Sequence, residues 1–220
     1  MYLLFTVALP LISPSPAEAP IVALRTACRP GQDMVASFRQ VYDNKLLQQS
    51  RTESGKLWLK ADGRVRWSYR QPVRKDFVFD GRTAYFYEPS FAQVTVFEDF
   101  SQSALFHSLQ FILNGGDAVA LYSVSWCHTD CPDTAPGQRL IELAPREGVA
   151  AVSRIHVIID ASGKYVRRSV VYDGLGNRTT YLFSDVVFGA SLPDAGFVFN
   201  MPDGVNVLRA TDRPSADKKP

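Results

Sequence analysis

The 220-residue chain has few of the side chains on which enzyme catalysis most often depends, with only three histidines and three cysteines. None of its serines lies in a Gly-x-Ser-x-Gly turn, and it contains no P-loop, Gly-x-Gly-x-x-Gly, His-Glu-x-x-His or calcium-loop motif. His107 falls in an expected helix and His156 in an apolar strand, where a structural role is the better prediction. We therefore expect a protein that is not an enzyme and has no catalytic residue, cofactor or metal site.

The chain also lacks an excess of charge of one sign and any long apolar run. Lys and Arg number 24 against 22 Asp and Glu, which gives a net charge of +2, and the charges are interspersed. Because no basic stripe could follow a phosphate backbone, nucleic acid is not an expected partner. The longest apolar run, residues 2–12, is shorter than the ~20 residues that a membrane-spanning helix needs. The mature protein is therefore expected to be soluble.

The N-terminal residues have the pattern of a secretory signal peptide. The apolar run is followed by Ser-Pro-Ser-Pro and by Ala17-Glu18-Ala19, a small-x-small site of the type that signal peptidase cleaves. The usual basic residues before the run are absent, which leaves open a start codon assigned too late or an ordinary buried segment. We predict a signal peptide over residues 1–19, one domain over residues 20–208 and a disordered polar tail over residues 209–220.

Cys127 and Cys131 stand four residues apart, and a disulfide between them is the favoured prediction. It would close a short loop worth about 2 kcal/mol of stability. Zinc binding together with His128 is less favoured, because adjacent residues of an extended chain point to opposite sides and no fourth ligand follows at a usual spacing. A thiol-disulfide enzyme is a further alternative, although such enzymes favour Cys-x-x-Cys at a helix start. Cys28 is left unpaired, and Arg25 three positions earlier disfavours lipid attachment there.

Period-two patterns dominate the chain after a short helix that we expect over residues 21–29. Val65, Trp67 and Tyr69 alternate with polar residues, which places the three on one face of a strand. Asp80-Gly81 predicts a two-residue type I′ hairpin. Nine to eleven short strands without alternating helices predict a mainly β fold, either an antiparallel barrel or a strongly curved sheet. Further strands are expected over residues 77–79, 83–87, 93–97, 139–143, 153–159, 164–172, 179–187 and 197–199.

One helix is expected to interrupt the strands over residues 101–116. Leu105, Leu109 and Leu113 recur at helical spacing, and Asn114-Gly115-Gly116 is a typical helix end. Aromatic residues make up 12% of the chain, and core packing is the simpler interpretation of that content alone. A curved sheet must still cover its apolar concave face. A helix laid across it either completes a filled core or acts as a lid over a ligand cavity.

A family resemblance extends over seven segments, at residues 37–40, 53–60, 66–72, 80–89, 93–96, 173–179 and 197–207. They include Arg66-Trp67-Ser68-Tyr69, Asp80-Gly81-Arg82-Thr83 and Phe197-Val198-Phe199-Asn200-Met201-Pro202. No single segment is specific. In their order and spacing, however, they resemble the periplasmic outer-membrane lipoprotein carrier family, LolA.

This resemblance implies an incomplete antiparallel β-barrel whose concave apolar face is covered by helices and holds the acyl chains of lipoproteins. It implies a monomeric periplasmic carrier that takes lipid-modified proteins from an inner-membrane ABC transporter and passes them to an outer-membrane acceptor lipoprotein. Ordinary core packing is the alternative for each residue that strand alternation and helical spacing assign to this site. The predicted cavity residues are Leu57, Leu59, Val65, Trp67, Tyr69, Phe77 and Phe79, and the predicted lid residues are Leu105, Leu109 and Leu113.

The chain departs from the family pattern at Ala61-Asp62, where the family commonly has Arg-Pro. In some members that arginine holds the lid shut. Arg64 or Arg66 could take its place as the lid latch, although strand alternation puts both on the face opposite Trp67. Alternative functions are a lipid-anchored acceptor, an envelope-stress sensor of similar fold, and a structural envelope protein with a filled core.

Overall fold

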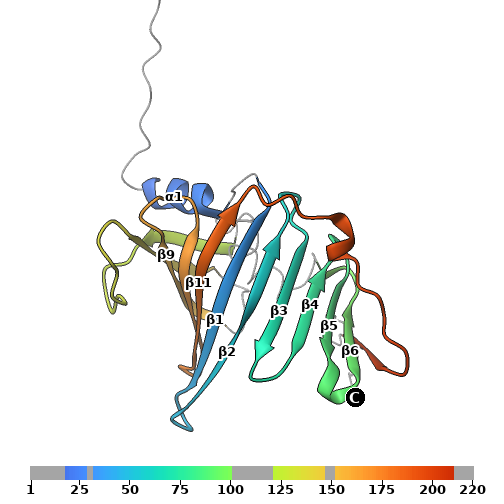
Figure 1. Ribbon diagram of the computed structural model, residues 1–220. Helices are drawn as coiled ribbons and strands as arrows, with labels where there is room; N and C mark the ends of the chain where they lie inside the picture. The colour runs from blue at the N-terminus through green and yellow to red at the C-terminus, as the bar shows by residue number, and fades with distance from the viewer. Residues whose placement is uncertain (1–17, 29–31, 101–120, 147–151, 211–220) are drawn as a thin grey trace, which may run out of the picture.

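The computed structural model describes residues 18–28, 32–100, 121–146 and 152–210, and the twelve strands of these residues form one sheet (Figure 1). The sheet is strongly curved and does not close into a barrel, because β12 and β7 remain its two edges. The strands are β1 Met34–Asn44, β2 Gln49–Leu59, β3 Val65–Gln71, β4 Lys75–Phe79, β5 Ala84–Glu88, β6 Gln93–Phe97, β7 Tyr122–Trp126, β8 Arg139–Pro145, β9 Val152–Ile159, β10 Val166–Asp173, β11 Arg178–Phe188 and β12 Asn206–Ala210.

The sheet consists of two antiparallel meanders joined through β1 and β11. The first runs from β1 to β6 and the second from β7 to β11, and the strand order is β12-β6-β5-β4-β3-β2-β1-β11-β10-β9-β8-β7. β1 pairs with β11 from Met34↔Phe188 to Asp43↔Arg178, with a register shift between Val35 and Ser37. The last strand, β12, pairs with β6 in parallel and is the exception to the antiparallel order.

Helix α1, Ala19–Cys28, lies across one end of the sheet and contacts β7 and β9 (Figure 1). Ala23, Leu24 and Ala27 are buried, as expected for the apolar stripe of an amphipathic helix. The helix predicted over residues 21–29 is thus confirmed within two residues. Two 3₁₀ turns, η1 Pro89–Phe91 and η3 Asp194–Phe197, connect strands. None of the described helices is both long and apolar enough to cross a bilayer.

The core lies on one face of the sheet, where cross-strand register brings apolar side chains into rows. Leu57 lies opposite Trp67, which in turn lies opposite Phe77. In the next row, Leu59 lies opposite Val65, and Val65 lies opposite Phe79. Directly opposed residues of neighbouring strands share a face, so each row continues the apolar surface across three strands.

Two sequence predictions about local structure are wrong. The chain between β4 and β5 is a four-residue loop, because the Asp80 carboxylate accepts the backbone N–H groups of Arg82 and Thr83 and only Gly81 has a positive φ. A two-residue type I′ turn would need positive φ at two positions. The strand expected over residues 197–199 is instead the end of η3 and an irregular segment, in which Phe197 is buried.

The strand count is also higher than the nine to eleven expected. β7 was not predicted, and neither was β12, which reaches Ala210 and so extends two residues past the predicted domain boundary. β12 is exposed along almost all its length and so has no buried face that would give it an alternating pattern, whereas β7 alternates serine with Tyr122, Val124 and Trp126, and this signal was missed. The helix expected over residues 101–116 and the signal-peptide residues up to 17 lie outside the described residues.

Gly55 allows the rings of neighbouring strands to meet in the core. It pairs with Phe38 of β1 and with Tyr69 of β3, whose ring centroids lie 4.9 Å apart. A Cβ atom on Gly55 would lie 1.8 Å from the Ser68 carbonyl oxygen and 2.9 Å from the Phe38 ring. The first of these atoms is backbone in a strand, so it cannot move away without breaking the register.

We predict that Gly55→Ala lowers the free energy of unfolding by about 3 kcal/mol, because the added methyl group overpacks the sheet. Gly174→Ala is the matched control, since nothing lies within 4 Å of its Cβ position, and we expect a change within about 0.5 kcal/mol. Urea unfolding followed by tryptophan fluorescence measures both. Equal losses in the two variants would contradict the proposed clash.

Candidate functional site

The seven predicted cavity residues lie on one face of the sheet. Leu57, Leu59, Val65, Trp67 and Phe79 are buried in a single apolar cluster, and Tyr69 and Phe77 are partly buried against it. The sequence therefore predicted correctly which side chains share a face, and their contact with a ligand stays a prediction. Leu105, Leu109 and Leu113, the predicted lid residues, lie outside the described residues, and their role stays a prediction.

Contacts between distant strands identify this face as the concave one, which we call the inner face. The Trp67 ring on β3 lies 5.5 Å from the Tyr181 ring and 6.3 Å from the Phe183 ring, both on β11. These strands are three steps apart in the sheet, or about 14 Å if the sheet were flat. Only curvature toward this side brings the rings so close, and alternate residues of the same strands form the outer face.

Aromatic rings line much of the inner face. Phe38 packs edge-on against Trp67 at a centroid distance of 5.2 Å. Phe77 and Phe79 each lie 5.5 Å from the Phe100 ring, which is fully buried. Such edge-to-face arrangements are the favoured packing of aromatic side chains. The inner face thus offers a continuous apolar surface to whatever covers it.

A polar cluster ends this apolar surface on the row that contains Gly55. The Lys75 ammonium donates a hydrogen bond of 2.7 Å to buried Glu53 and lies 4.5 Å from the centre of the Tyr69 ring. The Tyr69 hydroxyl donates to Gln40 Oε1 at 2.8 Å. Glu53 was missed in the sequence analysis. Side chains alternate between the two faces of a strand, so Glu53, four residues before Leu57, shares the inner face with it. The strand pattern in the sequence therefore already placed Glu53 on this face.

The two tyrosines of this region are harder to ionise than free tyrosine. Burial raises the pKa of Tyr181 to about 12, and the negative charge of nearby Glu53 adds to the effect. Burial is also the main cause that raises the pKa of Tyr69, with contributions from Tyr181 and Glu53. Both hydroxyls therefore stay neutral at any physiological pH and add no charge to the inner face.

Arg64 and Arg66 lie on the outer face and bind the C-terminal segment. Arg64 donates hydrogen bonds to the carboxylates of Asp62 and Asp194, which raise its pKa, and Arg66 donates to the Gly196 carbonyl oxygen. Asp62, one of the two residues that replace the family's Arg-Pro, thus holds Arg64 in place. The latch role of either arginine stays a prediction, because the predicted lid lies outside the described residues.

Lys60 and Asp33 also bind the C-terminal segment on the outer face. The Lys60 ammonium donates to the Leu192 carbonyl oxygen at 2.9 Å and to Asp194 at 2.7 Å. The Asp33 carboxylate accepts the backbone N–H groups of Ala61 and Leu192, which lower its pKa. The charged residues between β2 and β3 therefore fasten residues 192–196 to the outer face.

Two pockets lie on the outer side and differ in character from the inner face. One of about 470 Å³ is lined by Arg66, Arg70, Arg74 and Asp76 among others. The second, of about 830 Å³, lies between β5, β6 and β12 and contains Arg82, Glu98, Asp99 and Arg209. Both pockets are also lined by apolar side chains, so a hydrocarbon chain in either would lie partly against charged groups.

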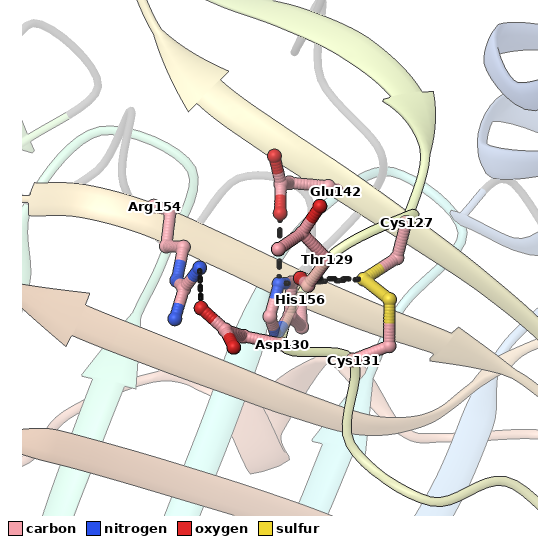
Figure 2. Close-up of a disulfide and its surroundings, with 7 residues drawn as sticks. All are labelled: Cys127, Thr129, Asp130, Cys131, Glu142, Arg154 and His156. Atoms are coloured by element: carbon pink, nitrogen blue, oxygen red, sulfur yellow. Dashed lines mark hydrogen bonds and ion pairs between the residues drawn. A yellow bond between two sulfur atoms is a disulfide. The ribbon is translucent and has the colours of Figure 1, made fainter.

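Cys127 and Cys131 are joined by a disulfide directly after β7 (Figure 2). The loop between them lies over His156 of β9, which is fully buried. His128, in contrast, is exposed within the loop. The sequence pattern thus anticipated the pairing of the cysteines but not their contact with a strand 29 residues away.

Comparison with known proteins gives a consistent result. The sequence profile described as outer membrane lipoprotein carrier protein LolA matches residues 31–200. The outer-membrane lipoprotein carrier protein of Nitrosomonas europaea is 28% identical over 213 residues, which cover 94% of this chain and 98% of the relative. That of Bordetella avium is 30% identical over 158 residues, or 71% of each chain.

The fold also has a counterpart among solved structures. An uncharacterized conserved protein from Thermus thermophilus superposes with a TM-score of 0.57 over 88% of this chain and 99% of that chain. Because the two sequences are only 10% identical, this likeness concerns the fold alone.

We predict that the protein loses stability above pH 10, because Tyr181 ionises near pH 10 in the unfolded chain but only near pH 12 in the fold. Its contribution is complete below pH 10 and is lost as the pH rises toward 12. The slope contributed by each such tyrosine is about 1.4 kcal/mol per pH unit. Urea unfolding at a series of pH values measures the slope, which Tyr181→Phe should reduce. An unchanged slope in that variant would contradict the assignment.

Proposed function

The chain belongs to the LolA family of outer-membrane lipoprotein carrier proteins, and from this membership we propose that it holds the acyl chains of its cargo against the inner face. The observation that carries the proposal is the apolar lining of that face, from Phe38 on β1 to Phe79 on β4. Acyl chains are recognised through apolar area and not through hydrogen bonds. The chemistry of the inner face matches this requirement more closely than the two outer pockets, whose linings mix charged with apolar side chains.

Trp67 offers one polar contact within this lining. Its indole N–H is buried and has no hydrogen-bond partner among the described residues. A buried donor without an acceptor destabilises a protein by about 1–3 kcal/mol. An ester or amide carbonyl of an acylated cysteine would supply the missing acceptor and would fix the position of the lipid along the face.

The proposed route begins at an inner-membrane ABC transporter and ends at an acceptor lipoprotein of the outer membrane. The protein would cross the periplasm as a monomeric carrier without cofactor and would catalyse no reaction. Export would depend on the predicted signal peptide over residues 1–19. A lipid-anchored acceptor would instead be acylated itself, so the intact mass of the mature protein distinguishes the two roles.

Release is the physical difficulty of such a carrier. Transfer of hydrocarbon from water gives about 0.8 kcal/mol per methylene, so complete burial of three chains would make dissociation too slow. Incomplete burial lowers this energy. A lid over residues 101–116 would lower the affinity further, by the fraction of molecules in which it is open.

We predict that native mass spectrometry of residues 20–220, purified from a periplasm with a co-expressed lipoprotein, shows a one-to-one complex. The complex should disappear when the acylated cysteine of the cargo is replaced by serine, because the acyl chains supply the binding energy. A carrier that stays bare with acylated cargo would contradict the proposal, and a complex that survives the serine substitution would contradict binding through lipid.

We predict that Phe77→Gln weakens cargo binding by about tenfold or more, because it replaces a partly buried phenyl ring whose complete burial by the lipid would be worth about 1.5 kcal/mol or more. Phe91→Gln is the matched control, since Phe91 is exposed in η1 and should not affect binding. Fluorescence titration with a synthetic acylated peptide measures the affinities, and urea unfolding measures the stability of each variant. A filled core would give the opposite result, a loss of stability with unchanged binding.

A further inference from the structure

A cluster of four potential metal ligands lies on the outer face at the edge of the sheet near β7. Glu142 on β8 lies directly opposite His156 on β9, and Cys127 follows β7, the neighbour of β8. Figure 2 shows the imidazole of His156 between the Glu142 carboxylate and the disulfide. These residues take no part in the proposed binding of acyl chains, because Glu142 and His156 alternate with the inner-face residues Leu143 and Ile155.

The distances within the cluster are those of a metal site. His156 Nε2 lies 3.0 Å from Glu142 Oε2 and 3.8 Å from Cys127 Sγ, and the three ligand atoms all lie within 4.8 Å of one another. In a tetrahedral zinc site, bond lengths of about 2.0–2.3 Å place neighbouring ligand atoms about 3.3–3.8 Å apart. Small side-chain rotations therefore suffice to surround one ion.

We propose that reduction of the Cys127–Cys131 disulfide creates a site for a thiophilic divalent cation such as Zn²⁺, with Glu142 and His156 as the remaining ligands. A thiol or phosphine reductant supplies two electrons, the S–S bond breaks, and each sulfur takes up a proton. The cation then displaces both thiol protons to solvent and keeps its charge. In the oxidised protein the two sulfurs are bonded to each other, so no thiolate is available and the site is closed.

The loop that carries the cysteines is held in place by contacts other than the disulfide. Asp130 forms an ion pair of 4.0 Å with Arg154 on β9, and the guanidinium of Arg168 on β10 donates to the Asp133 carbonyl oxygen. The Cα atoms of the cysteines are 5.9 Å apart. Both sulfurs therefore stay near His156 when the bond between them is broken.

The His156 ring is held rigidly, but its Nδ1 atom lacks a hydrogen-bond partner among the described residues. It is fully buried and packs edge-on against Tyr172 at 5.2 Å, which fixes the ring. When Nε2 binds a metal, Nδ1 carries the proton, and Nδ1 is buried without a partner among the described residues. Metal-bound histidines usually donate this proton to an acceptor, and loss of such a partner lowers metal affinity about 10–100-fold. The site is therefore expected to bind less tightly than a structural zinc site.

The test uses the full mature chain, oxidised and after reduction with a phosphine. Co²⁺ titration is the direct probe, because thiolate ligands give a charge-transfer band in the near ultraviolet and tetrahedral geometry gives intense visible bands. Competition with a chromophoric chelator then gives the Zn²⁺ affinity. We expect one equivalent of Co²⁺ with both signatures in the reduced protein only. No thiolate band after reduction, or equal binding in the oxidised protein, would overturn the proposal.

Variants decide which side chains bind the ion. His156→Ala and Glu142→Gln should each weaken Zn²⁺ binding by at least tenfold, whereas His128→Ala should leave it unchanged because His128 is exposed and lies outside the cluster. Urea unfolding of the oxidised variants checks folding. If His156→Ala does not fold, the half-buried Glu142 still tests the site. Loss of binding in His128→Ala with full binding in Glu142→Gln would assign the metal to the loop alone and would refute the site.

Discussion

The pairing of β1 with β11 is the constraint on which the rest of the structure depends. It joins residues as far apart in sequence as Met34 and Phe188, and the Ser37 hydroxyl also donates a hydrogen bond of 2.6 Å to the Asp185 carboxylate. Without it the chain would form two separate meanders, each with an apolar face open to water. With it the curved sheet brings Trp67 of β3 against Phe183 of β11, so each meander covers part of the inner face of the other. The loop-closure entropy of this long-range pairing is offset by the apolar area that both halves bury.

Local alternation was enough to predict the faces of the strands but not their neighbours. Val65, Trp67 and Tyr69 share a face because the side-chain period of a strand is two, whatever lies beside it. The pairing of Glu142 with His156, in contrast, depends on the register between β8 and β9, which no single strand encodes. For the same reason the cysteine spacing predicted the disulfide and left the adjacent ligands unrecognised. The prediction at Asp80-Gly81 failed for a different reason, because the Asp80 carboxylate accepts backbone N–H groups of the loop and so changes the turn type.

The two faces of the sheet carry different chemistry, and the structure keeps them apart. The inner face is apolar up to the row of Gly55, where Lys75 and Glu53 neutralise each other. The outer face carries Lys60 and Arg64, whose ion pairs fasten the C-terminal segment, and at its far edge the disulfide loop. The pleat of each strand produces this separation, because successive side chains point to opposite faces. A charged residue shifted by one position along its strand would therefore point into the core. A redox event at Cys127 can therefore reach the inner face through β7, whose residue Trp126 packs against the core, and through β8 and β9, whose alternate residues are Leu143 and Ile155.

The burial of the inner-face residues bears on how a carrier can release its cargo. Leu57 and Val65 are fully buried in the structure as it stands, and Trp67 is only 3% exposed. An acyl chain that enters gains the free energy of leaving water, but these side chains gain little, because they are already out of water. The acyl chain would also displace the packing among Phe38, Trp67 and their neighbours, and the loss of those contacts offsets part of its free-energy gain. A lining that packs against itself thus lowers the affinity for each methylene below that of a preformed empty cavity, and it does so without any specific latch.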